Sequence, residues 1–313
     1  MRSTAASWGR EASFLSATDR VTLGYILLTT LLLVAGTSRL EQPASHYLVR
    51  AGMVTLILVV AYLDRETSSR WARFVHAFYP LLFLGYFFPE TDYFNNLFFQ
   101  AFDPQLIRLE LALFGTMPSV AFSRCCPWPW FSEVMHAAYF SFYVIILFFM
   151  FRYYYRHHRL FAYRTFQFFT AFYLFYLIFS LFPSEGPQYY LMPPDNVVPH
   201  GYVMTELMNR ILVLGDRPTG AFPSSHIGMT WLLMYFFYRD DRRAFYGWLL
   251  PALLLTLATV YIKAHYAVDV IGGFLMVPLL IWVGQTLYPL LASETSLPEG
   301  EVVPESPVVP PML

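Results

Sequence analysis

Residues 221–228 place a histidine beside two hydroxyl side chains, in the sequence Ala-Phe-Pro-Ser-Ser-His-Ile-Gly. Pro223 fits immediately before a helix, and Ser224 or Ser225 can cap the first turn. At such a helix start, the free backbone N–H groups and the positive end of the helix dipole favour an anion. The segment therefore predicts an anion site beside His226, while a capped helix with an interfacial histidine remains an alternative interpretation.

A second polar segment covers residues 263–269 and reads Lys-Ala-His-Tyr-Ala-Val-Asp. His265 and Asp269 are four residues apart, so on a helical turn they share a face. The carboxylate can then hold an imidazole N–H and fix the tautomer of the ring. Lys263 is the single lysine among the 20 basic residues. Because a His–Asp pair also occurs as a plain structural hydrogen bond, this segment alone leaves its role open.

Together these residues have the groups needed for nucleophilic catalysis on phosphorus. A neutral His265 oriented by Asp269 can attack a phosphate and form a phosphohistidine, while His226 protonates the departing oxygen and later activates the acceptor. Other groups would bind the phosphate oxygens: Ser224, Ser225, Lys263 and the amides of the helix start. We expect no cofactor and no metal, since the sequence contains no His-Glu-x-x-His, paired-aspartate or Gly-rich phosphate motif.

The composition indicates that membrane helices position these residues. The chain of 313 residues is 57% hydrophobic and 13% charged, whereas a soluble domain has roughly 45–50% apolar and about 25% charged residues. Aromatic residues, 19% of the chain, crowd the ends of apolar runs, as expected at lipid headgroups. The adjacent pair Cys125 and Cys126 cannot build a disulfide framework. The net charge of −1 indicates no nucleic-acid partner.

Uncharged runs locate the membrane spans, because a bilayer core needs about 20 apolar residues per helix. The runs lie at residues 21–37, 45–63, 74–88, 134–151, 165–182, 226–238, 245–262 and 270–288. The second run contains Arg50, and the sixth is short. We therefore predict an all-α integral membrane protein with about eight transmembrane helices. The first run is interpreted as a retained helix rather than a signal peptide, because its charged leader is long and contains acidic residues.

The distribution of arginines predicts the orientation of the chain. Of the 20 basic residues, 13 fall in four segments on one side: residues 1–20, 64–73, 152–164 and 239–243. By the positive-inside rule this side is cytoplasmic, and both termini lie there. The two polar segments, nearly forty residues apart, then return to the opposite, non-cytoplasmic face. Because ionisable groups are costly at a membrane edge, their convergence indicates function.

Two long connections, residues 89–133 and 183–225, lie on the same non-cytoplasmic side. In the first, Asp103-Pro104 precedes Leu106, Leu109 and Leu113 at helical spacing, which predicts a helix lying in the membrane interface. The second contains seven prolines and cannot form one helix. The end of the chain, residues 290–313, is rich in proline and glutamate and is predicted to be disordered.

At the residues with catalytic potential, the sequence resembles the phosphatidic acid phosphatase type 2 superfamily. The second motif of that superfamily is Pro-Ser-Gly-His, and this chain has Pro-Ser-Ser-His at residues 223–226. Its third motif is Ser-Arg, five residues, His, three residues, Asp, and this chain has Ala258-Thr259 followed by His265 and Asp269. The resemblance implies that His265 is the nucleophile, Asp269 its partner and His226 the acid and base.

The resemblance also implies a division of the chain. A six-helix catalytic core would occupy residues 74–289. It would follow a cytosolic segment, residues 1–20, and two additional transmembrane helices in residues 21–73. Residues 290–313 would form the tail.

The departures from these motifs concern the phosphate contacts. Thr259 replaces the arginine of the third motif, and Lys263 could supply the charge from another angle. The first motif, Lys, six residues, Arg-Pro, is matched in spacing by Arg210 and Arg217-Pro218, although the gap to the second motif is shorter than usual. We therefore expect Arg217 to contact phosphate. Glu185 and Glu206 are candidate contacts to a polyol headgroup.

The missing arginine, the serine before His226 and the sequence His-Tyr-x-x-Asp resemble the inositol phosphorylceramide synthase branch. This resemblance implies transfer of a phosphoalcohol headgroup from a phospholipid donor to a lipid acceptor, in sphingolipid or phospholipid metabolism. A lipid phosphate phosphatase with the same site is the alternative.

A polytopic transporter is less favoured, although His265, Asp269 and Lys263 could form a proton relay. Such relays usually lie near the bilayer midplane on broken helices, often in repeated halves, and we find no internal repeat. A membrane scaffold would leave the clustered polar groups without a purpose.

Overall fold

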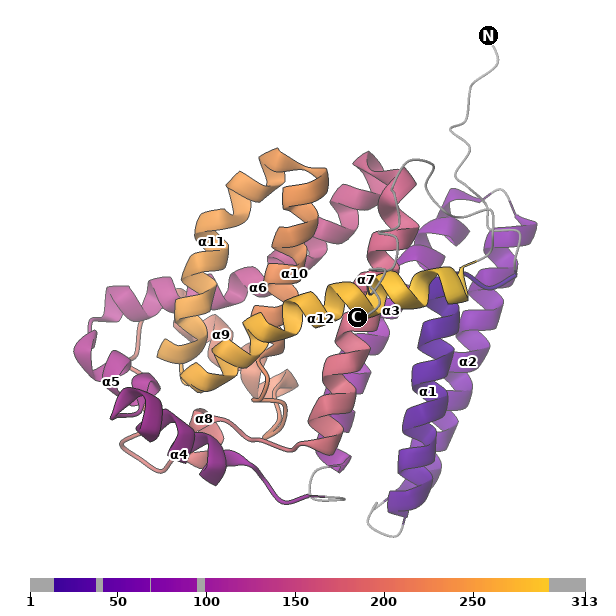
Figure 1. Cartoon of the computed structure of the whole chain (residues 1–313). Helices are drawn as coiled ribbons and strands as arrows, with labels where there is room; N and C mark the ends of the chain where they lie inside the picture. The colour runs from indigo at the N-terminus through magenta and orange to yellow at the C-terminus, as the bar shows by residue number, and fades with distance from the viewer. Residues whose placement is uncertain (1–13, 38–41, 68, 95–98, 293–313) are drawn as a thin grey trace, which may run out of the picture.

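The computed structural model describes residues 14–37, 42–67, 69–94 and 99–292, and within these ranges it contains helices but no strand (Figure 1). The first six are α1 (Ala17–Gly36), α2 (Pro43–Glu66), α3 (Arg70–Glu90), the 3-10 helix η2 (Thr91–Phe94), α4 (Asp103–Phe114) and α5 (Pro118–Cys125). The others are α6 (Pro129–Arg156), α7 (His158–Leu181), α8 (Pro187–Tyr190), α9 (Val203–Gly215), α10 (Ser225–Asp240), α11 (Arg242–Tyr261) and α12 (Ala267–Leu291). Most of the predicted disordered tail, residues 293–313, lies outside the described residues.

Six helices are long and apolar enough to cross a bilayer: α1, α2, α6, α7, α11 and α12. Helices α4 and α5 meet the same criterion only as a pair bent by 64°, which describes a broken span or a re-entrant loop. The chain is therefore an all-helical integral membrane protein. The third and sixth predicted spans form helices α3 and α10, but neither is among the six. Since α10 has 16 residues, it is about 24 Å long. The total of eight spans remains a prediction.

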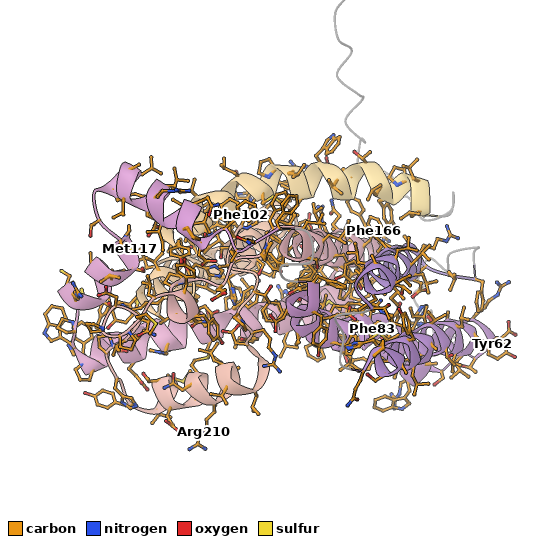
Figure 2. The ribbon with its side chains drawn as sticks, turned by 90° about the horizontal axis from the view of Figure 1, so that it is seen from below. Tyr62, Phe83, Phe102, Met117, Phe166 and Arg210 are labelled. Carbon is orange, nitrogen blue, oxygen red and sulfur yellow. The ribbon has the colours of Figure 1, made fainter. Side chains whose placement is uncertain are left out.

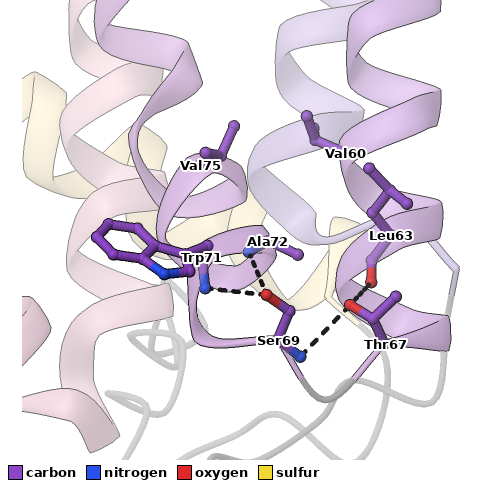
Figure 3. Close-up of a pocket in the computed structure, with 7 residues that line it drawn as sticks. All are labelled: Val60, Leu63, Thr67, Ser69, Trp71, Ala72 and Val75. Carbon is purple, nitrogen blue, oxygen red and sulfur yellow. Dashed lines mark hydrogen bonds between the residues drawn. The ribbon is translucent and has the colours of Figure 1, made fainter.

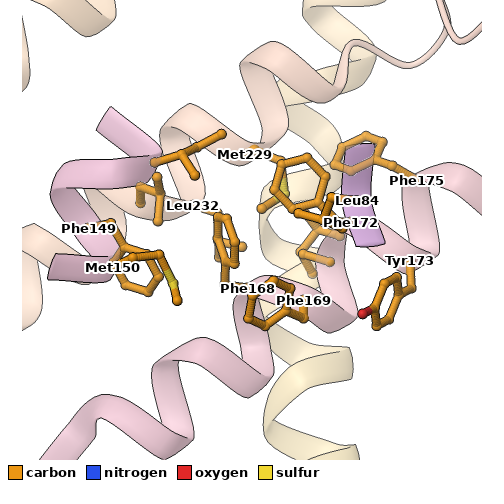
Figure 4. Close-up of a cluster of buried hydrophobic side chains, with 14 of the residues drawn as sticks. Leu84, Phe149, Met150, Phe168, Phe169, Phe172, Tyr173, Phe175, Met229 and Leu232 are labelled. Atoms are coloured by element: carbon orange, nitrogen blue, oxygen red, sulfur yellow. The ribbon is translucent and has the colours of Figure 1, made fainter. Parts of the chain in front are cut away.

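Helix α7 forms the centre of the bundle and contacts α1, α6, α10 and α12. Its phenylalanines from Phe166 to Phe179 are buried on all sides of the helix, as expected for an element enclosed by others rather than one facing lipid. Figure 4 shows Phe168, Phe172 and Phe175 of α7 among Met229 and Leu232 of α10. The core therefore fixes α10, the helix that begins with the predicted anion site, against the middle of the bundle.

Helix α4 begins at Asp103, as predicted, and has two different faces. Leu109 and Leu113 point outward, whereas Asp103, Leu106 and Glu110 are buried against the protein. The predicted apolar stripe is therefore divided between the two faces, and the interfacial position of the helix remains a prediction. The two carboxylates on the opposite face contact the segment between α11 and α12.

The arginine in the second predicted span is paired inside the protein. Arg50 of α2 forms an ion pair of 2.7 Å with Glu90 at the end of α3, and its guanidinium also donates to Thr29 Oγ1 of α1. Both charged side chains are almost fully buried. Pairing explains how a charge is tolerated within an apolar helix.

A groove separates α2 and α3 at the end of the bundle distant from α4 and α8 (Figures 1 and 3). Its lining is mostly apolar, with Val60 and Leu63 on α2 and Val75 on α3. Ser69 caps α3 by accepting from the backbone N–H groups of Trp71 and Ala72. The groove has no histidine or carboxylate in its lining and plays no part in the site described below.

Candidate active site

The two predicted catalytic histidines are in direct contact. His226 lies in the first turn of α10, and His265 lies in the connection between α11 and α12. The Nδ1 atom of His226 is 3.1 Å from the Nε2 atom of His265. The two polar segments therefore converge at one end of the bundle, as the order of the predicted helices indicates.

The hydrogen bonds of His265 define its tautomer. Its Nδ1 is 2.8 Å from the carbonyl oxygen of Ala221. Because a carbonyl can only accept, Nδ1 must carry the proton, and in the neutral ring Nε2 then has the free lone pair. Nε2 consequently accepts from the Nδ1–H of His226. This arrangement presents an unprotonated nitrogen of one histidine to an N–H of the other.

Asp269 contacts His265 less closely than its spacing predicts. Its Oδ2 is 3.6 Å from His265 Nδ1, an ion-pair distance rather than a hydrogen bond. The same oxygen accepts from the backbone N–H of Tyr266 at 2.7 Å, because His265 precedes α12 rather than lying on its first turn. Asp269 therefore caps α12 and places a carboxyl group behind the imidazole, while Ala221 accepts the hydrogen bond.

Burial keeps the His265 ring neutral. It lowers the pKa of His265 to about 4, although the hydrogen bond to Ala221 and the charge of Asp216 oppose the shift. The ring is therefore uncharged at neutral pH, which is the state that a nucleophilic nitrogen requires.

The aromatic surface of α6 orients the second histidine. The ring of His226 stacks on Tyr139 with a centroid distance of 4.7 Å and packs against Phe142 at 4.3 Å. Within the described part of the chain, its Nε2 forms no hydrogen bond. The ring is thus held by packing, and its polar contact is made to His265.

Two close helix contacts bring the histidines together. Ser224 caps α10 as predicted, accepting from the N–H of Ile227, and its own N–H donates to the carbonyl of Asp269. Gly273 of α12 faces this cap, and a Cβ there would lie 2.6 Å from the Ser224 carbonyl oxygen. Only a glycine allows α12 to approach the start of α10 this closely.

Helix α4 holds the connection that carries His265. Asp103 Oδ1 accepts from the phenol of Tyr266 and from the backbone N–H of Gly186, each at 2.9 Å. Glu110 Oε1 accepts from the backbone N–H groups of Ala267 and Val268, the first residues of α12. These carboxylates supply acceptors for helix-end donors that would otherwise be unsatisfied. The sequence pattern predicts Asp103 at a helix start but does not identify the partners of Asp103 or Glu110.

The structure separates the predicted phosphate contacts. Ser224 and Ser225 lie at the start of α10 and are buried. The Lys263 ammonium donates to Ser123 Oγ of α5 at 2.5 Å, and burial lowers its pKa to about 8. Arg217 donates to the backbone carbonyl of Asp216. In the described chain, no hydrogen bond or ion pair joins an arginine or lysine to His226 or His265, so the phosphate-binding roles remain predictions.

Two further candidates from the sequence lie outside the site. Arg210 and Glu206 form an exposed ion pair on α9, and Figure 2 shows Arg210 pointing away from the body of the protein. Thr259, at the position of the expected arginine, is buried and accepts the N–H of His265 through its carbonyl oxygen at 3.1 Å. This position therefore supports the His265 connection but supplies no charge.

A comparison with protein families identifies the class of the protein. The family model described as the PAP2 superfamily matches residues 104–283, which include both histidines and Asp269. The chain therefore belongs to the PAP2 superfamily, as its motifs indicate. Searches of curated proteins and of solved structures found no match. Membership indicates phosphatase or phosphotransferase activity on lipids.

Proposed function

We propose that this protein is a membrane lipid phosphotransferase that moves a phosphoalcohol headgroup from a phospholipid to a lipid acceptor, as inositol phosphorylceramide synthases do. The observation that carries the proposal is the contact between His265 Nε2 and His226 Nδ1, with the other ring nitrogen of His265 bound to Ala221. This contact places a nucleophilic nitrogen and a proton donor at hydrogen-bonding distance from each other.

In the first step, the lone pair of His265 Nε2 attacks phosphorus, and the bond between phosphorus and the glyceride oxygen breaks. His226 transfers its Nδ1 proton to that oxygen and releases diacylglycerol. For this step the substrate phosphate lies between the two rings, and its contacts replace the N–H···N hydrogen bond that joins them in the structure. Asp269, behind the ring, stabilises the positive charge of the phosphohistidine.

In the second step, neutral His226 takes the proton from the acceptor hydroxyl. The acceptor oxygen attacks phosphorus, the bond between phosphorus and Nε2 breaks, and His265 regains its lone pair. With a lipid phosphate as the donor and water as the acceptor, the same groups in the same roles would give a phosphatase.

The charge of the site favours a phosphodiester substrate over a phosphate monoester. A diester carries one negative charge, whereas a monoester approaches two at neutral pH. Thr259 supplies no positive charge, and the ammonium of Lys263 is directed to α5. The lower charge of a diester requires less compensation, which supports headgroup transfer over hydrolysis of a lipid phosphate.

The distribution of basic residues supports a site on the non-cytoplasmic face. The segments 64–73 and 239–243 join helices at the end opposite to that of His226 and His265. Because these segments are rich in arginine, the positive-inside rule assigns their end to the cytoplasm.

The test is headgroup transfer by purified protein in liposomes, with a fluorescent ceramide or diacylglycerol as acceptor and assorted phospholipids as donors. Wild type should make a new phosphorylated lipid, and His265→Ala should make none. His46→Ala, a histidine on α2 that contacts Tyr86 rather than the site, is the matched control and should retain activity. Free phosphate released from a lipid phosphate, without a new lipid, would identify a phosphatase. Equal results for wild type and His265→Ala would refute the catalytic assignment.

A further inference from the structure

A carboxylate that sequence reasoning did not select lies beside the catalytic histidines. Asp216 follows α9, and its Oδ2 accepts from Gln188 Nε2 at 2.6 Å and from the phenol of Tyr189 at 3.1 Å. The backbone N–H of Gln188 donates to the carbonyl of Lys263 at 2.9 Å, in the connection that carries His265. Asp216 is therefore fixed to the active site through α8.

The second oxygen of this carboxylate is available for a ligand. In the described chain, Asp216 Oδ1 accepts no hydrogen bond, and no basic side chain forms an ion pair with the carboxylate. The neighbouring guanidinium of Arg217 donates to the backbone carbonyl of Asp216 instead. The carboxylate is partly buried, and burial raises its pKa. The free Oδ1 can therefore accept hydrogen bonds from a ligand.

The surroundings of Asp216 place it near the reacting phosphate. A Cβ on Gly186, directly before α8, would lie 2.9 Å from the carbonyl oxygen of Ala264 and 3.2 Å from Cβ of Ala221, so α8 packs against the residue before His265 and against its hydrogen-bond acceptor. A substrate phosphate between the two histidines would therefore have its substituent close to Asp216.

A negative group in this position disfavours a bare phosphate, which contains acceptors and negative charge but no donors. It suits a substituent whose O–H or N–H groups can donate to the free Oδ1. The side-chain oxygens of Gln188 and Tyr189 offer further acceptors on the same wall. Binding of such donors would satisfy the carboxylate and would orient the phosphate toward His265.

Building on the proposed headgroup transfer, we propose that Asp216, with Gln188 and Tyr189, forms a subsite for the alcohol part of the headgroup, selecting alcohols with free hydroxyl or ammonium donors. Glycerol and inositol headgroups have the hydroxyl form of this chemistry, and ethanolamine has the ammonium form. Choline esters have neither donor. The subsite thus makes the headgroup, rather than the acyl chains, the part of the donor that is selected.

The experiment compares donors in vesicles of otherwise equal composition. Phosphatidylinositol, phosphatidylglycerol, phosphatidylethanolamine or phosphatidylcholine is supplied with one fluorescent acceptor, and kcat/KM is measured for each. Wild type should prefer at least one donor-bearing headgroup to choline. In Asp216→Asn, this preference should fall by at least 10-fold. The headgroup whose kcat/KM relative to choline falls in Asp216→Asn identifies the group that the subsite binds. A fall for inositol or glycerol indicates hydroxyl groups, and a fall for ethanolamine indicates an ammonium group.

The matched control is Glu206→Gln, an exposed carboxylate on α9 paired with Arg210, which should leave the preference intact. An equal loss for all four donors in Asp216→Asn would overturn the subsite, because an effect transmitted through the pKa of His265 would not distinguish headgroups. A wild-type preference for choline would also overturn it.

Failure of the proposed transfer gives a different result. If wild type transfers no headgroup from any donor, the subsite is tested by the thermal shift that soluble glycerol 3-phosphate, inositol 1-phosphate, phosphoethanolamine and phosphocholine each produce. At least one donor-bearing compound should raise the Tm of wild type more than phosphocholine does, and Asp216→Asn should remove that difference. Identical shifts in the two proteins would overturn the subsite.

Discussion

Replacing Asp269 by asparagine tests how the catalytic histidine is stabilised. The asparagine carbonyl can still accept the N–H of Tyr266, so the cap of α12 is preserved while the charge is removed. In the proposed mechanism, the phosphohistidine on Nε2 keeps a proton on Nδ1 and is positively charged, and the carboxylate oxygen Oδ2 of Asp269 lies 3.6 Å from that nitrogen. At an effective dielectric constant of about 20, this separation corresponds to about 4–5 kcal/mol of attraction.

Since about 1.4 kcal/mol corresponds to a tenfold change in rate, we expect kcat to fall by about 10³-fold in Asp269→Asn. KM should change little, because the charge that Asp269 stabilises develops only during the reaction. The assay is the liposome transfer reaction, with melting temperature as the measure of folding.

Asp64→Asn is the matched control. Like Asp269, Asp64 has a carboxylate that contacts a histidine: its Oδ2 is 2.8 Å from Nδ1 of His76, and this pair does not belong to the candidate active site. It should leave kcat unchanged. A loss of less than tenfold in Asp269→Asn would refute the electrostatic argument and would assign the orientation of His265 to the carbonyl of Ala221.

Three further predictions concern the supports and the protonation of the site. Glu110→Ala leaves two N–H groups at the start of α12 without their acceptor and should destabilise the protein by about 1–2 kcal/mol, seen as a lower melting temperature together with reduced turnover. Gly273→Ala should force α10 away from α12 and lower kcat at least tenfold with about 1–3 kcal/mol of destabilisation, whereas Gly247→Ala, which has open space around its Cβ, should retain activity. Because the pKa of His265 is about 4 when folded and about 6.5 when unfolded, kcat/KM should show no inflection from this ring near pH 6.5. Below pH 6.5 the unfolded ring binds a proton that the folded ring excludes, so wild-type stability should decrease from pH 6.5 to pH 4 by more than that of His265→Gln, as measured by denaturant unfolding.

The convergence of His226 and His265 can be predicted from the sequence because it depends only on the order of the membrane helices. The polar segments sit at the ends of apolar runs, and the alternation of spans returns them to one face. The capping role of Ser224 follows from local residue preferences in the same way and is confirmed by the structure.

The partners of these residues could not be predicted, because they come from distant parts of the chain or from the backbone. The acceptor for His265 is the carbonyl of Ala221, a group that every residue has. Glu110 binds residues more than 150 positions later, and no local pattern encodes such a contact. The direction of Lys263 depends on its left-handed backbone conformation, with φ of 64°, which its residue type does not indicate.

The buried ion pair between Arg50 and Glu90 has a consequence for the biogenesis of the protein. An arginine within an apolar helix opposes insertion by roughly 2.5–3.5 kcal/mol at the bilayer centre, and less toward the ends of a span. The charge of Arg50 is matched only when Glu90, at the end of the next helix, has been synthesised. Helices α2 and α3 should therefore leave the translocon together as a hairpin, and a nascent chain that ends between them should integrate poorly.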